Sequence, residues 1–357
     1  MEGITWSYIH TLGFTHRELF LLAEVAENPR THLQNFSAGQ FPEWITANRK
    51  SQVVLALKTA SLAQYEEKFD RIGAHAILHT DAEFPESLRH IPHVPFYLSV
   101  RGNLRNIPFL SIVGSRKSTT YGHELVKYFT GPLVRSGYGI VSGGALGIDA
   151  YAHDAAVKAG GYTIAVMGTG IDYLYPRTNL GVYDRILASG GALVSHFPLG
   201  TEANPYNFPI RNELIAGFSR GILLIEAKEK SGTLITAQIA LDLGKDVFVP
   251  PADYTRENSL GTNRLLQQGC AKLVLAPEDI LLEYDVAIPD TQAIVRSKFE
   301  DANTEALYVL LQIGYKHPDD LVAHSGLAVD QVLVILSILE LDGHVRMAAD
   351  GTYQISS

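Results

Sequence analysis

The sequence predicts an α/β protein, with a doubly wound sheet flanked by an N-terminal helical domain and a C-terminal winged-helix domain. Two observations predict this class. Between residues 109 and 275, short apolar runs take turns with segments of helical periodicity. The apolar runs show no polar alternation, which is typical of parallel strands covered by helices on both faces. Near the C-terminus, three helical segments precede a β-hairpin signal, which is the element order of a winged helix.

Length and composition indicate an ordinary globular protein of two or three domains. The chain has 357 residues, of which 46% are hydrophobic and 19% are charged. Its single cysteine, Cys270, excludes an intramolecular disulfide and a multi-cysteine metal site, and fits a reducing compartment. The N-terminus shows no secretory signal, and no apolar run approaches the roughly 18 residues of a membrane helix. We therefore expect a soluble cytoplasmic protein.

The net charge of −9 is unevenly distributed along the chain. Residues 107–285 carry 15 basic and 17 acidic side chains, a net charge of −2, whereas residues 300–357 carry two basic and nine acidic side chains, a net charge of −7. The overall charge argues against nucleic acid, but the nearly neutral middle segment can hold a local basic groove. The acidic C-terminal segment is a poor surface for phosphates.

The first 70 residues are expected to form a small helical domain. Apolar residues recur at helical spacing over residues 4–66, and Asn28-Pro29 interrupts the pattern. A plain helical bundle is one interpretation. A nucleic-acid-binding module of the sterile-alpha-motif or helix-hairpin-helix kind is the other, although only the basic pair Arg49-Lys50 supports it.

Residues 71–106 are expected to be a connector with one short strand. The strand candidate is Ala74–Leu78, and the later prolines Pro85, Pro92 and Pro95 favour extended chain. The histidine pairs of this segment have no accompanying cluster of carboxylates or cysteines, so we expect no metal site.

Residues 107–285 are expected to form the doubly wound domain. The strand candidates are Phe109–Val113, Gly139–Ser142, Thr163–Met167, Ala192–Ser195, Gly221–Glu226, Asp246–Val249 and Lys272–Leu275. The helix candidates are Gly122–Ser136, Ile148–Ala159, Leu180–Ala188, Asn212–Gly217, Thr233–Leu243 and Ser259–Gln268. Sheets of this kind bind ligands outside the carboxyl ends of their strands, so the loops that follow the strands are the candidate site.

The last part of the chain is expected to be a linker at residues 286–303 and a winged-helix domain at residues 304–357. The expected elements are helices at Thr304–Ile313, Pro318–Ser325 and Val329–Leu341 and a hairpin of His344–Met347 with Thr352–Ile355. The third helix carries no Lys or Arg, and phosphate contacts dominate DNA affinity. We therefore expect this domain to contact protein or to regulate rather than to bind DNA.

Five loops follow predicted strands and share one chemistry. They are residues 114–122, 142–149, 168–179, 208–212 and 228–237. Each combines glycines, hydroxyl side chains or amide side chains with an Arg, a Lys or a helix N-terminus, which suits a polyanion held by its phosphates. Tyr173 and Tyr175 offer stacking faces in the third loop.

The loops lack the signatures of common nucleotide enzymes. No third glycine follows Gly168-Thr-Gly at the spacing of the dinucleotide fingerprint, and no Walker motif is present. Ser142 and Ser231 have no identifiable His and Asp partners, so no catalytic constellation stands out. We expect no cofactor and no metal.

The loops, taken in order, resemble the DNA-processing protein A family (DprA, also called Smf). The matching motifs are Gly-Ser-Arg…Tyr-Gly, Ser-Gly-x-Ala-x-Gly-Ile-Asp-x-x-Ala-His, Gly-x-Gly-x-Asp-x-x-Tyr-Pro-x-x-Asn, Phe-Pro-x-Arg-Asn-x-x-Ile-Ala-Gly and Glu-Ala-x-x-x-Ser-Gly-Thr-Leu-Ile-Thr-Ala. The resemblance implies an extended Rossmann-like domain that binds single-stranded DNA and forms a homodimer. It also implies delivery of incoming strands to the recombinase RecA, past single-strand-binding protein, in natural transformation.

The resemblance also assigns site residues. The expected nucleic-acid-binding residues all lie in the five loops. They are Gly114, Ser115, Arg116, Ser142, Gly143, Gly144, Arg177, Arg211, Asn212, Ser231, Gly232 and Thr233. Four positions depart from the family pattern. They are Leu146, where a cation is frequent, His196, where Glu is frequent, Glu213, where Arg is usual, and Pro251, where Gly is common.

Two other functions remain open from the sequence. The first is a nucleotide-processing hydrolase of the phosphoribohydrolase kind, although its Pro-Gly-Gly-x-Gly-Thr signature is missing. The second is an adaptor that acts through the acidic winged helix. The five loops favour a protein that binds a polyanion such as DNA without catalysis, and the resemblance implies that this protein is a recombination mediator.

Overall fold

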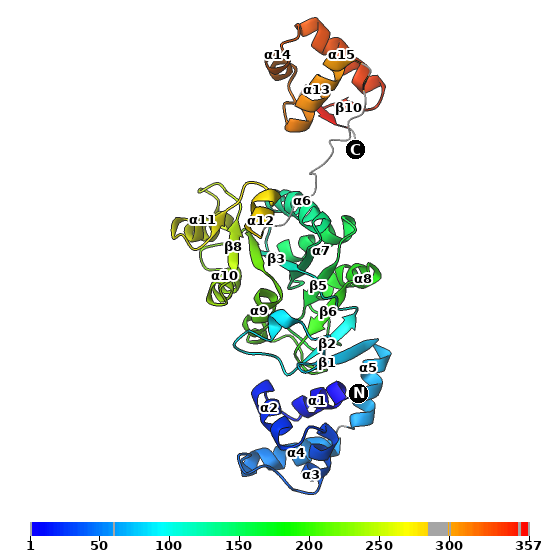
Figure 1. Cartoon of the computed structure of the whole chain (residues 1–357), viewed down its shortest axis with the longest axis vertical. Coiled ribbons are helices and arrows are strands. Elements are labelled where there is room, and N and C mark those ends of the chain that lie inside the picture. Colours follow the sequence, from blue (N-terminus) through cyan, green and yellow to red (C-terminus); the bar gives the residue numbers. More distant parts are fainter. Residues whose placement is uncertain (1, 60, 285–298, 300, 349–350, 356–357) are drawn as a thin grey trace. The chain divides into compact units, whose positions relative to one another are not determined.

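The computed structural model describes residues 2–59, 61–284, 299, 301–348 and 351–355. It divides into two compact units, residues 1–289 and residues 290–357 (Figure 1). The linker expected at 286–303 lies largely outside the described residues.

The first unit begins with helices that pack around an aromatic core. They are α1 (Glu2–Thr11), α2 (His16–Val25), α3 (Pro29–Ser37), α4 (Ala47–Thr59) and α5 (Leu62–Arg71). Thr15 and Glu18 form a capping box that starts α2, and Pro29 occupies the first turn of α3, where no backbone N–H is needed. Trp6, Phe36 and residues of the sheet share one buried cluster. The helices therefore dock on the sheet through a common core.

The sheet is mostly parallel, as the apolar runs predicted. Its strands are β1 (Ala74–Leu78), β2 (Tyr97–Gly102), β3 (Phe109–Gly114), β4 (Gly139–Ser142), β5 (Thr163–Val166), β6 (Ala192–Ser195), β7 (Gly221–Ile225), β8 (Asp246–Val249) and β9 (Lys272–Leu273). They lie in the order β1-β2-β6-β5-β4-β3-β7-β8-β9, and those from β3 to β9 are parallel. The chain moves outward from β3 in both directions, so the topological switch point lies between β3 and β7.

The segment at residues 71–106 corrects one expectation. It was expected to be a connector with a single strand, but β2 pairs antiparallel with β6, and β1 pairs antiparallel with β2. The segment therefore extends the sheet by two strands. The prolines at 85, 92 and 95 all precede β2, so they do not interrupt its ladder.

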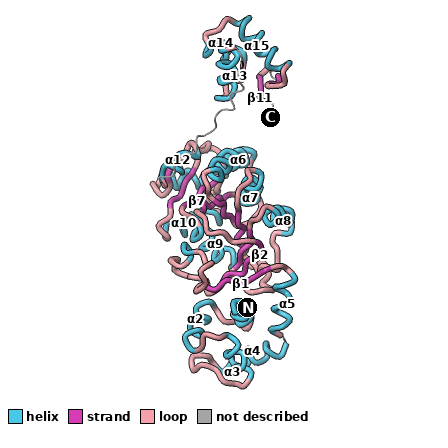
Figure 2. Tube along the Cα trace, turned by 45° about the vertical axis from the view of Figure 1, so that its right-hand side comes forward, coloured by secondary structure: helices cyan, strands magenta, loops and turns pink. Residues whose placement is uncertain are grey.

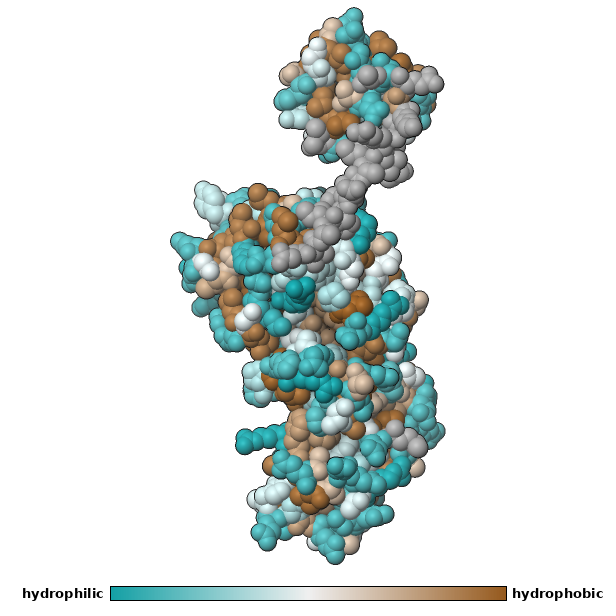
Figure 3. Space-filling model, in the orientation of Figure 1, coloured by the Kyte–Doolittle hydropathy of each residue, from teal (hydrophilic) through white to brown (hydrophobic). Residues whose placement is uncertain are grey.

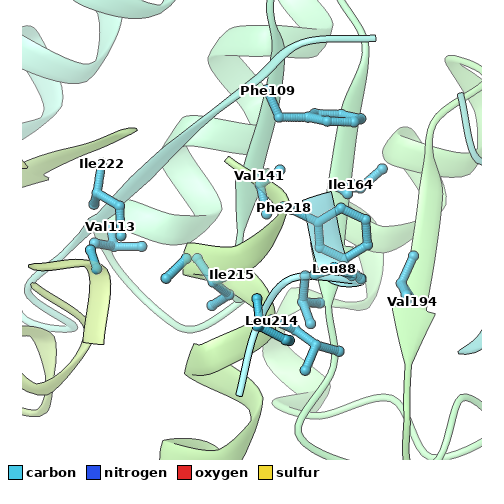
Figure 4. Packing of buried hydrophobic residues seen from close by; sticks show 14 of the residues in the cluster. Leu88, Phe109, Val113, Val141, Ile164, Val194, Leu214, Ile215, Phe218 and Ile222 are labelled. Carbon is cyan, nitrogen blue, oxygen red and sulfur yellow. The ribbon is translucent and has the colours of Figure 1, made fainter. Parts of the chain in front are cut away.

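Helices cover both faces of the sheet (Figure 2). They are α6 (Thr120–Arg135), α7 (Ile148–Lys158), α8 (Leu180–Ala188), α9 (Asn207–Phe218), α10 (Gly232–Asp242), α11 (Leu260–Gln267) and α12 (Pro277–Glu283). One core joins α9 and α10 to the sheet, and in Figure 4 Leu214, Ile215 and Phe218 of α9 lie beside Val141 and Ile164. A second core joins α6, α7 and α12 to the opposite face. Successive strand residues enter different cores, which is the two-residue alternation of a doubly covered sheet.

The second unit has the element order expected of a winged helix. It contains α13 (Ala302–Ile313), α14 (Pro318–Ser325), α15 (Val329–Leu341), β10 (Val345–Met347) and β11 (Tyr353–Ile355). β10 and β11 pair antiparallel, and Leu307, Leu321, Leu336 and Tyr353 meet in one core. Within the described residues, no single helix is long and apolar enough to cross a membrane. Helices α14 and α15 meet the required length and hydropathy only when they are taken together, and the chain bends by 117° between them.

Candidate nucleic-acid interface

A groove of about 610 Å³ lies at the carboxyl ends of β3 and β7, at the switch point of the sheet. Eight of the expected binding residues line this carboxyl-edge groove: Gly114, Ser115, Arg116, Arg211, Asn212, Ser231, Gly232 and Thr233. They come from three segments that are far apart in the sequence, and the parallel sheet brings these together. The four other expected residues, Ser142, Gly143, Gly144 and Arg177, do not line it.

Glu226 holds the loop that carries Arg116. Its carboxylate accepts hydrogen bonds from the backbone N–H of Thr119, at 2.9 Å, and from the Thr119 hydroxyl. Glu226 has a φ of 58°, which non-glycine residues seldom adopt and which is common where a functional site fixes the backbone. The loop also packs closely, since a Cβ at Gly114 would collide with the carbonyl of Ile225. Arg116 is thereby presented at the surface, with its Cζ 5.5 Å from the centre of the Phe208 ring.

Arg211 is a buried cation at the base of the groove, with only 4% of its surface exposed. Its Nη1 donates to the backbone carbonyls of Gly143, at 2.5 Å, and Val166, and its Nε donates to Asn212 Oδ1 at 3.2 Å. Nη2 donates no hydrogen bond in the part of the chain that the structure describes, and it is not among the fully buried polar atoms there that lack a partner. Its donors are therefore open to a ligand or water in the groove.

Asp149 balances this charge from the first turn of α7. Burial raises the pKa of its carboxyl, while Arg211 and the backbone N–H groups of Ala145 and Gly143 act in the opposite direction. Both N–H groups donate to Asp149 Oδ2, at 3.3 and 3.1 Å. The carboxylate is therefore occupied by amides, although it lines the groove.

The Ser142-Gly143-Gly144 turn supports the groove from below. Ser142 is fully buried and donates to the carbonyl of Ile112 at 2.7 Å. The carbonyl of Gly144 accepts from Asn179 Nδ2 and from the Tyr183 hydroxyl, both at 2.9 Å. The turn thus uses its polar groups within the protein. Arg177, the other expected residue outside the groove, is exposed at the start of a short 3-10 helix, Arg177–Asn179.

The N-terminus of α10 faces the groove, and backbone N–H groups of its first turn are available to a ligand. The Ser231 hydroxyl caps the helix by accepting from the backbone N–H of Thr233 at 3.2 Å, and the Thr233 hydroxyl donates to the carbonyl of Gly114 at 3.1 Å. A Cβ added at Gly232 would meet no atom within 4 Å, so the space before this residue is open. The first turn of a helix leaves backbone N–H groups without intrahelical partners and attracts anions.

Tyr175, which the sequence indicated as a stacking face, lines the groove, whereas Tyr173 does not. Sequence reasoning did not single out four other groove residues: Lys117, Lys228, Lys230 and Phe208. All four lie within the loops that the sequence indicated. Lysines and aromatic residues are common in surface loops, so the sequence carries no signal that sets these residues apart. What distinguishes them is that the fold brings them together in one groove. Phe208 lies between two cations, with its ring centre 5.5 Å from Arg116 Cζ and 5.8 Å from Arg211 Cζ.

The positions that depart from the family pattern lie around the groove rather than in it. Glu213 accepts hydrogen bonds from the backbone N–H of His93, at 3.0 Å, and from its ring, so its acid charge is directed away toward the segment before β2. His196 is buried against the N-terminal helices. Leu146 is 44% exposed, and Pro251 accepts a hydrogen bond from the Tyr121 hydroxyl. None of the four lines the groove.

Within the described residues, no group of three or more His, Cys, Asp or Glu side chains is arranged to hold a metal ion. His153 is buried on α7, and its Nδ1 forms a hydrogen bond with the Thr163 hydroxyl at 2.8 Å. Burial lowers its pKa to about 3.

Comparison with known families gives two matches. The family model described as DNA recombination-mediator protein A matches residues 75–285, and the DprA winged helix domain matches residues 299–351. Protein Smf of Escherichia coli K12 is 37% identical over 287 residues, which are 78% of this chain and 76% of that protein. DNA processing protein DprA of Bacillus subtilis is 38% identical over 225 residues, 62% of this chain and 74% of that protein.

Two solved structures share the fold. The X-ray structure of DNA processing protein A from Streptococcus pneumoniae has a TM-score of 0.65 and 32% identity, and the match covers 78% of this chain and 97% of that one. A structure of DNA processing protein A from Helicobacter pylori, solved to describe its single-stranded DNA binding mode, has a TM-score of 0.54 and 26% identity. This second match covers 60% of this chain and 97% of that one.

Proposed function

Because the chain belongs to the DNA recombination-mediator protein A family, we propose that it binds single-stranded DNA in the carboxyl-edge groove and acts there without catalysis. The structure of the Helicobacter pylori relative was solved for its single-stranded DNA binding mode, which supports the same ligand here. The site itself supplies the physical argument.

The observation that carries the proposal is the charge of the groove. Five cations line it, namely Arg116, Lys117, Arg211, Lys228 and Lys230, against one acid, Asp149, which backbone amides already occupy. The chain as a whole has a net charge of −9, so this concentration of cations is local. A local basic groove in an acidic protein attracts a polyanion to one place on the surface.

The groove also offers faces for bases. Tyr175 and Phe208 lie with their ring centres 6.0 Å apart, and both line the groove. Stacking on aromatic rings tolerates any base, and duplex DNA keeps its bases unavailable for it. We therefore propose that phosphates contact the cations and the N-terminus of α10, while unpaired bases contact the rings.

The proposal extends to partners. We propose that the bound strand is passed to RecA during natural transformation, that single-strand-binding protein is displaced from it, and that this takes place in the cytoplasm. We also propose a homodimer formed through the β9 edge of the sheet. Leu273, Leu275 and Leu282 are exposed there, and Figure 3 shows hydrophobic side chains gathered around α12. An exposed strand edge with apolar side chains is a natural site for pairing with a second copy.

The central experiment compares two exposed arginines. Arg116→Ala is expected to weaken binding to single-stranded DNA about fivefold to tenfold and to reduce the slope of log affinity against log salt by about one. The matched control is Arg135→Ala, because Arg135 is also exposed, lies in the last turn of α6 and does not line the groove. Fluorescence anisotropy at two salt concentrations measures both. Equal affinity of the wild type for single-stranded and duplex DNA, or an unchanged Arg116→Ala variant, would contradict the proposal.

The absence of catalysis has a separate test. The purified protein is incubated with each nucleoside monophosphate, and release of free base is followed by chromatography. We expect no release. Base release that Arg116→Ala abolishes would instead establish the phosphoribohydrolase function, which uses the same kind of phosphate-binding loops.

A further inference from the structure

A second hollow lies beyond the carboxyl end of β8. It has a volume of about 440 Å³ and is lined by Tyr121, Pro251, Ala252, Asp253, Tyr254 and Arg256. No residue of this Tyr254 hollow belongs to the carboxyl-edge groove. The lining consists of two aromatic rings, two apolar residues, one arginine and one aspartate. The rings suit a flat, unpaired base and the arginine suits a phosphate beside it, while the Asp253 carboxylate is engaged by Thr255.

The aromatic residues of the hollow differ in how firmly they are held. The Tyr121 hydroxyl donates to the carbonyl of Pro251 at 2.7 Å, and Arg256 Cζ lies 5.6 Å from the centre of the Tyr121 ring. Tyr254 is 81% exposed and has no ring contact, hydrogen bond or ion pair within the described part of the chain. A large side chain with so much apolar surface in water gains most from a flat ligand that covers it.

The hollow continues the groove along the sheet edge. β3, β7 and β8 are neighbours, so the loops that follow them are adjacent. Asn258 Nδ2 donates to the carbonyl of Lys117 at 2.9 Å, and Lys228 Nζ lies 2.7 Å from Glu257. Lys117 and Lys228 both line the groove. The segment that forms the hollow is thus joined directly to two groove residues.

The charges of this segment are partly matched among themselves. Asp253 accepts hydrogen bonds from the backbone N–H and hydroxyl of Thr255, at 2.9 and 2.8 Å. Arg256 Nε lies 3.8 Å from Asp253 Oδ2, a loose pair between exposed groups that contributes little. Arg256 can therefore turn toward a phosphate at small cost. Glu257 would repel a strand if it were free, but Lys228 pairs with it.

We propose that the Tyr254 hollow is a second nucleobase subsite, in which Tyr254 and Tyr121 stack on a base of the same DNA strand that occupies the groove and Arg256 contacts the adjoining phosphate. This inference rests on the proposed function, because the strand must first lie in the groove. It adds a direction to that function: the strand leaves the groove past Lys117 and crosses the β8 loop.

The test varies the length of the strand. An oligothymidylate of about 6 nucleotides occupies the groove alone, and one of about 20 nucleotides also reaches the hollow. Tyr254→Ala is expected to weaken binding of the long strand about fivefold and to leave binding of the short strand unchanged. Tyr254→Phe is expected to bind both like the wild type, because stacking requires the ring and not the hydroxyl. The control is Tyr128→Ala, which removes an exposed tyrosine on α6 outside both sites.

The outcomes separate this inference from the function on which it rests. If the wild type binds neither strand, the proposed function is wrong. If the wild type binds both and Tyr254→Ala has the same affinity as Tyr128→Ala for the long strand, the function stands and the subsite is wrong. A position-specific readout accompanies the series: 5-iodouracil placed along the long strand should crosslink to a peptide that contains Tyr254. Crosslinks confined to peptides of the groove would also overturn the subsite.

Discussion

Two arginines that look alike in the sequence have different roles in the structure. Arg116 is exposed over Phe208, and it can be removed without disturbing the fold. Arg211 is buried and links two neighbouring strands. It donates hydrogen bonds to the carbonyl of Gly143, which follows β4, and to the carbonyl of Val166, which ends β5. An alanine at 211 removes the donor to two buried carbonyls and the cation that offsets the buried Asp149 carboxylate, although that carboxylate keeps its two amide donors. An alanine at 116 leaves nothing unpaired.

We therefore predict that Arg211→Ala destabilises the protein by about 3 kcal/mol, because it removes the donor to two buried carbonyl groups and the cation that offsets the buried charge of Asp149. Arg116→Ala is expected to change the free energy of unfolding by less than about 0.5 kcal/mol. Urea unfolding followed by circular dichroism measures both. A loss of DNA affinity in Arg211→Ala counts as a binding effect only under conditions in which the unfolding curve shows that this variant is folded. Equal stability of the two variants would show that Arg211 is not structural.

At the scale of elements, the interface between the N-terminal helices and the sheet depends on neutral histidines. His16 Nε2 donates to the carbonyl of His196 at 2.8 Å, and His16 Nδ1 accepts from the backbone N–H of Phe96 at 3.1 Å. His10 lies against it, with ring centres 4.6 Å apart. Burial lowers the pKa of His16 from 6.5 to about 4, and burial also lowers the pKa of His10 and His196. A proton on Nδ1 would break the bond to Phe96.

This interface predicts a loss of stability in acid. The pKa of His16 in the folded state lies below its ordinary value, so the folded protein holds this histidine neutral. The contribution of neutral His16 to the free energy of unfolding is complete above about pH 6.5 and falls as the pH drops toward 4. We expect the free energy of unfolding to decrease by about 1 to 2 kcal/mol between pH 7.5 and pH 5 from this residue. His16→Asn should be less stable at pH 7.5 but show a flatter dependence on pH. A dependence as steep as that of the wild type would assign the effect to other groups.

The β9 edge gives a second prediction at this scale. Leu275 is 66% exposed beside β9, and a lysine there would place a charge in the proposed interface between two copies. Leu275→Lys is expected to be a monomer by sedimentation velocity. The matched control is Leu55→Lys, since Leu55 on α4 is 64% exposed and lies far from β9 in the sequence. A wild-type monomer at micromolar concentration, or a Leu275→Lys dimer, would remove this edge from consideration.

At the scale of the whole molecule, charge and binding are divided between the two units. The groove lies in residues 1–289, and residues 300–357 carry a net charge of −7. α15 has no Lys or Arg on any of its faces, so it offers phosphates no cation.

Removal of residues 300–357 is therefore expected to leave affinity for single-stranded DNA within about twofold at physiological salt. At low salt the shortened chain should bind somewhat more tightly, because the removed segment repels phosphates and that repulsion is screened as salt rises. Anisotropy titrations of both chains at the same salt concentrations decide this. A loss of binding on truncation would show that the winged helix takes part in DNA contact.

The sequence by itself determined the parallel strands between residues 109 and 275 and the loops that follow them. Short unalternated runs such as Phe109–Val113 and Gly139–Ser142 matched the observed strands closely, because a strand buried on both faces must be apolar throughout. α9 was underestimated, since it begins at Asn207 rather than Asn212. Pro209 in its first turn obscured the start, although a proline there costs no hydrogen bond. The strand β2 was missed for a similar reason, because prolines precede it without entering its ladder.

Only the tertiary structure decided which way each candidate residue faces. Sequence places Gly143 and Gly232 in equivalent glycine-containing loops, yet Gly143 is covered by the Arg211 guanidinium and Gly232 faces open space. Sequence likewise cannot show that Asp149 is occupied by amides or that Glu213 is turned toward His93. The physical reason is that loop composition fixes which groups are available, whereas packing of the helices on the two sheet faces fixes which of them remain unpaired at the surface.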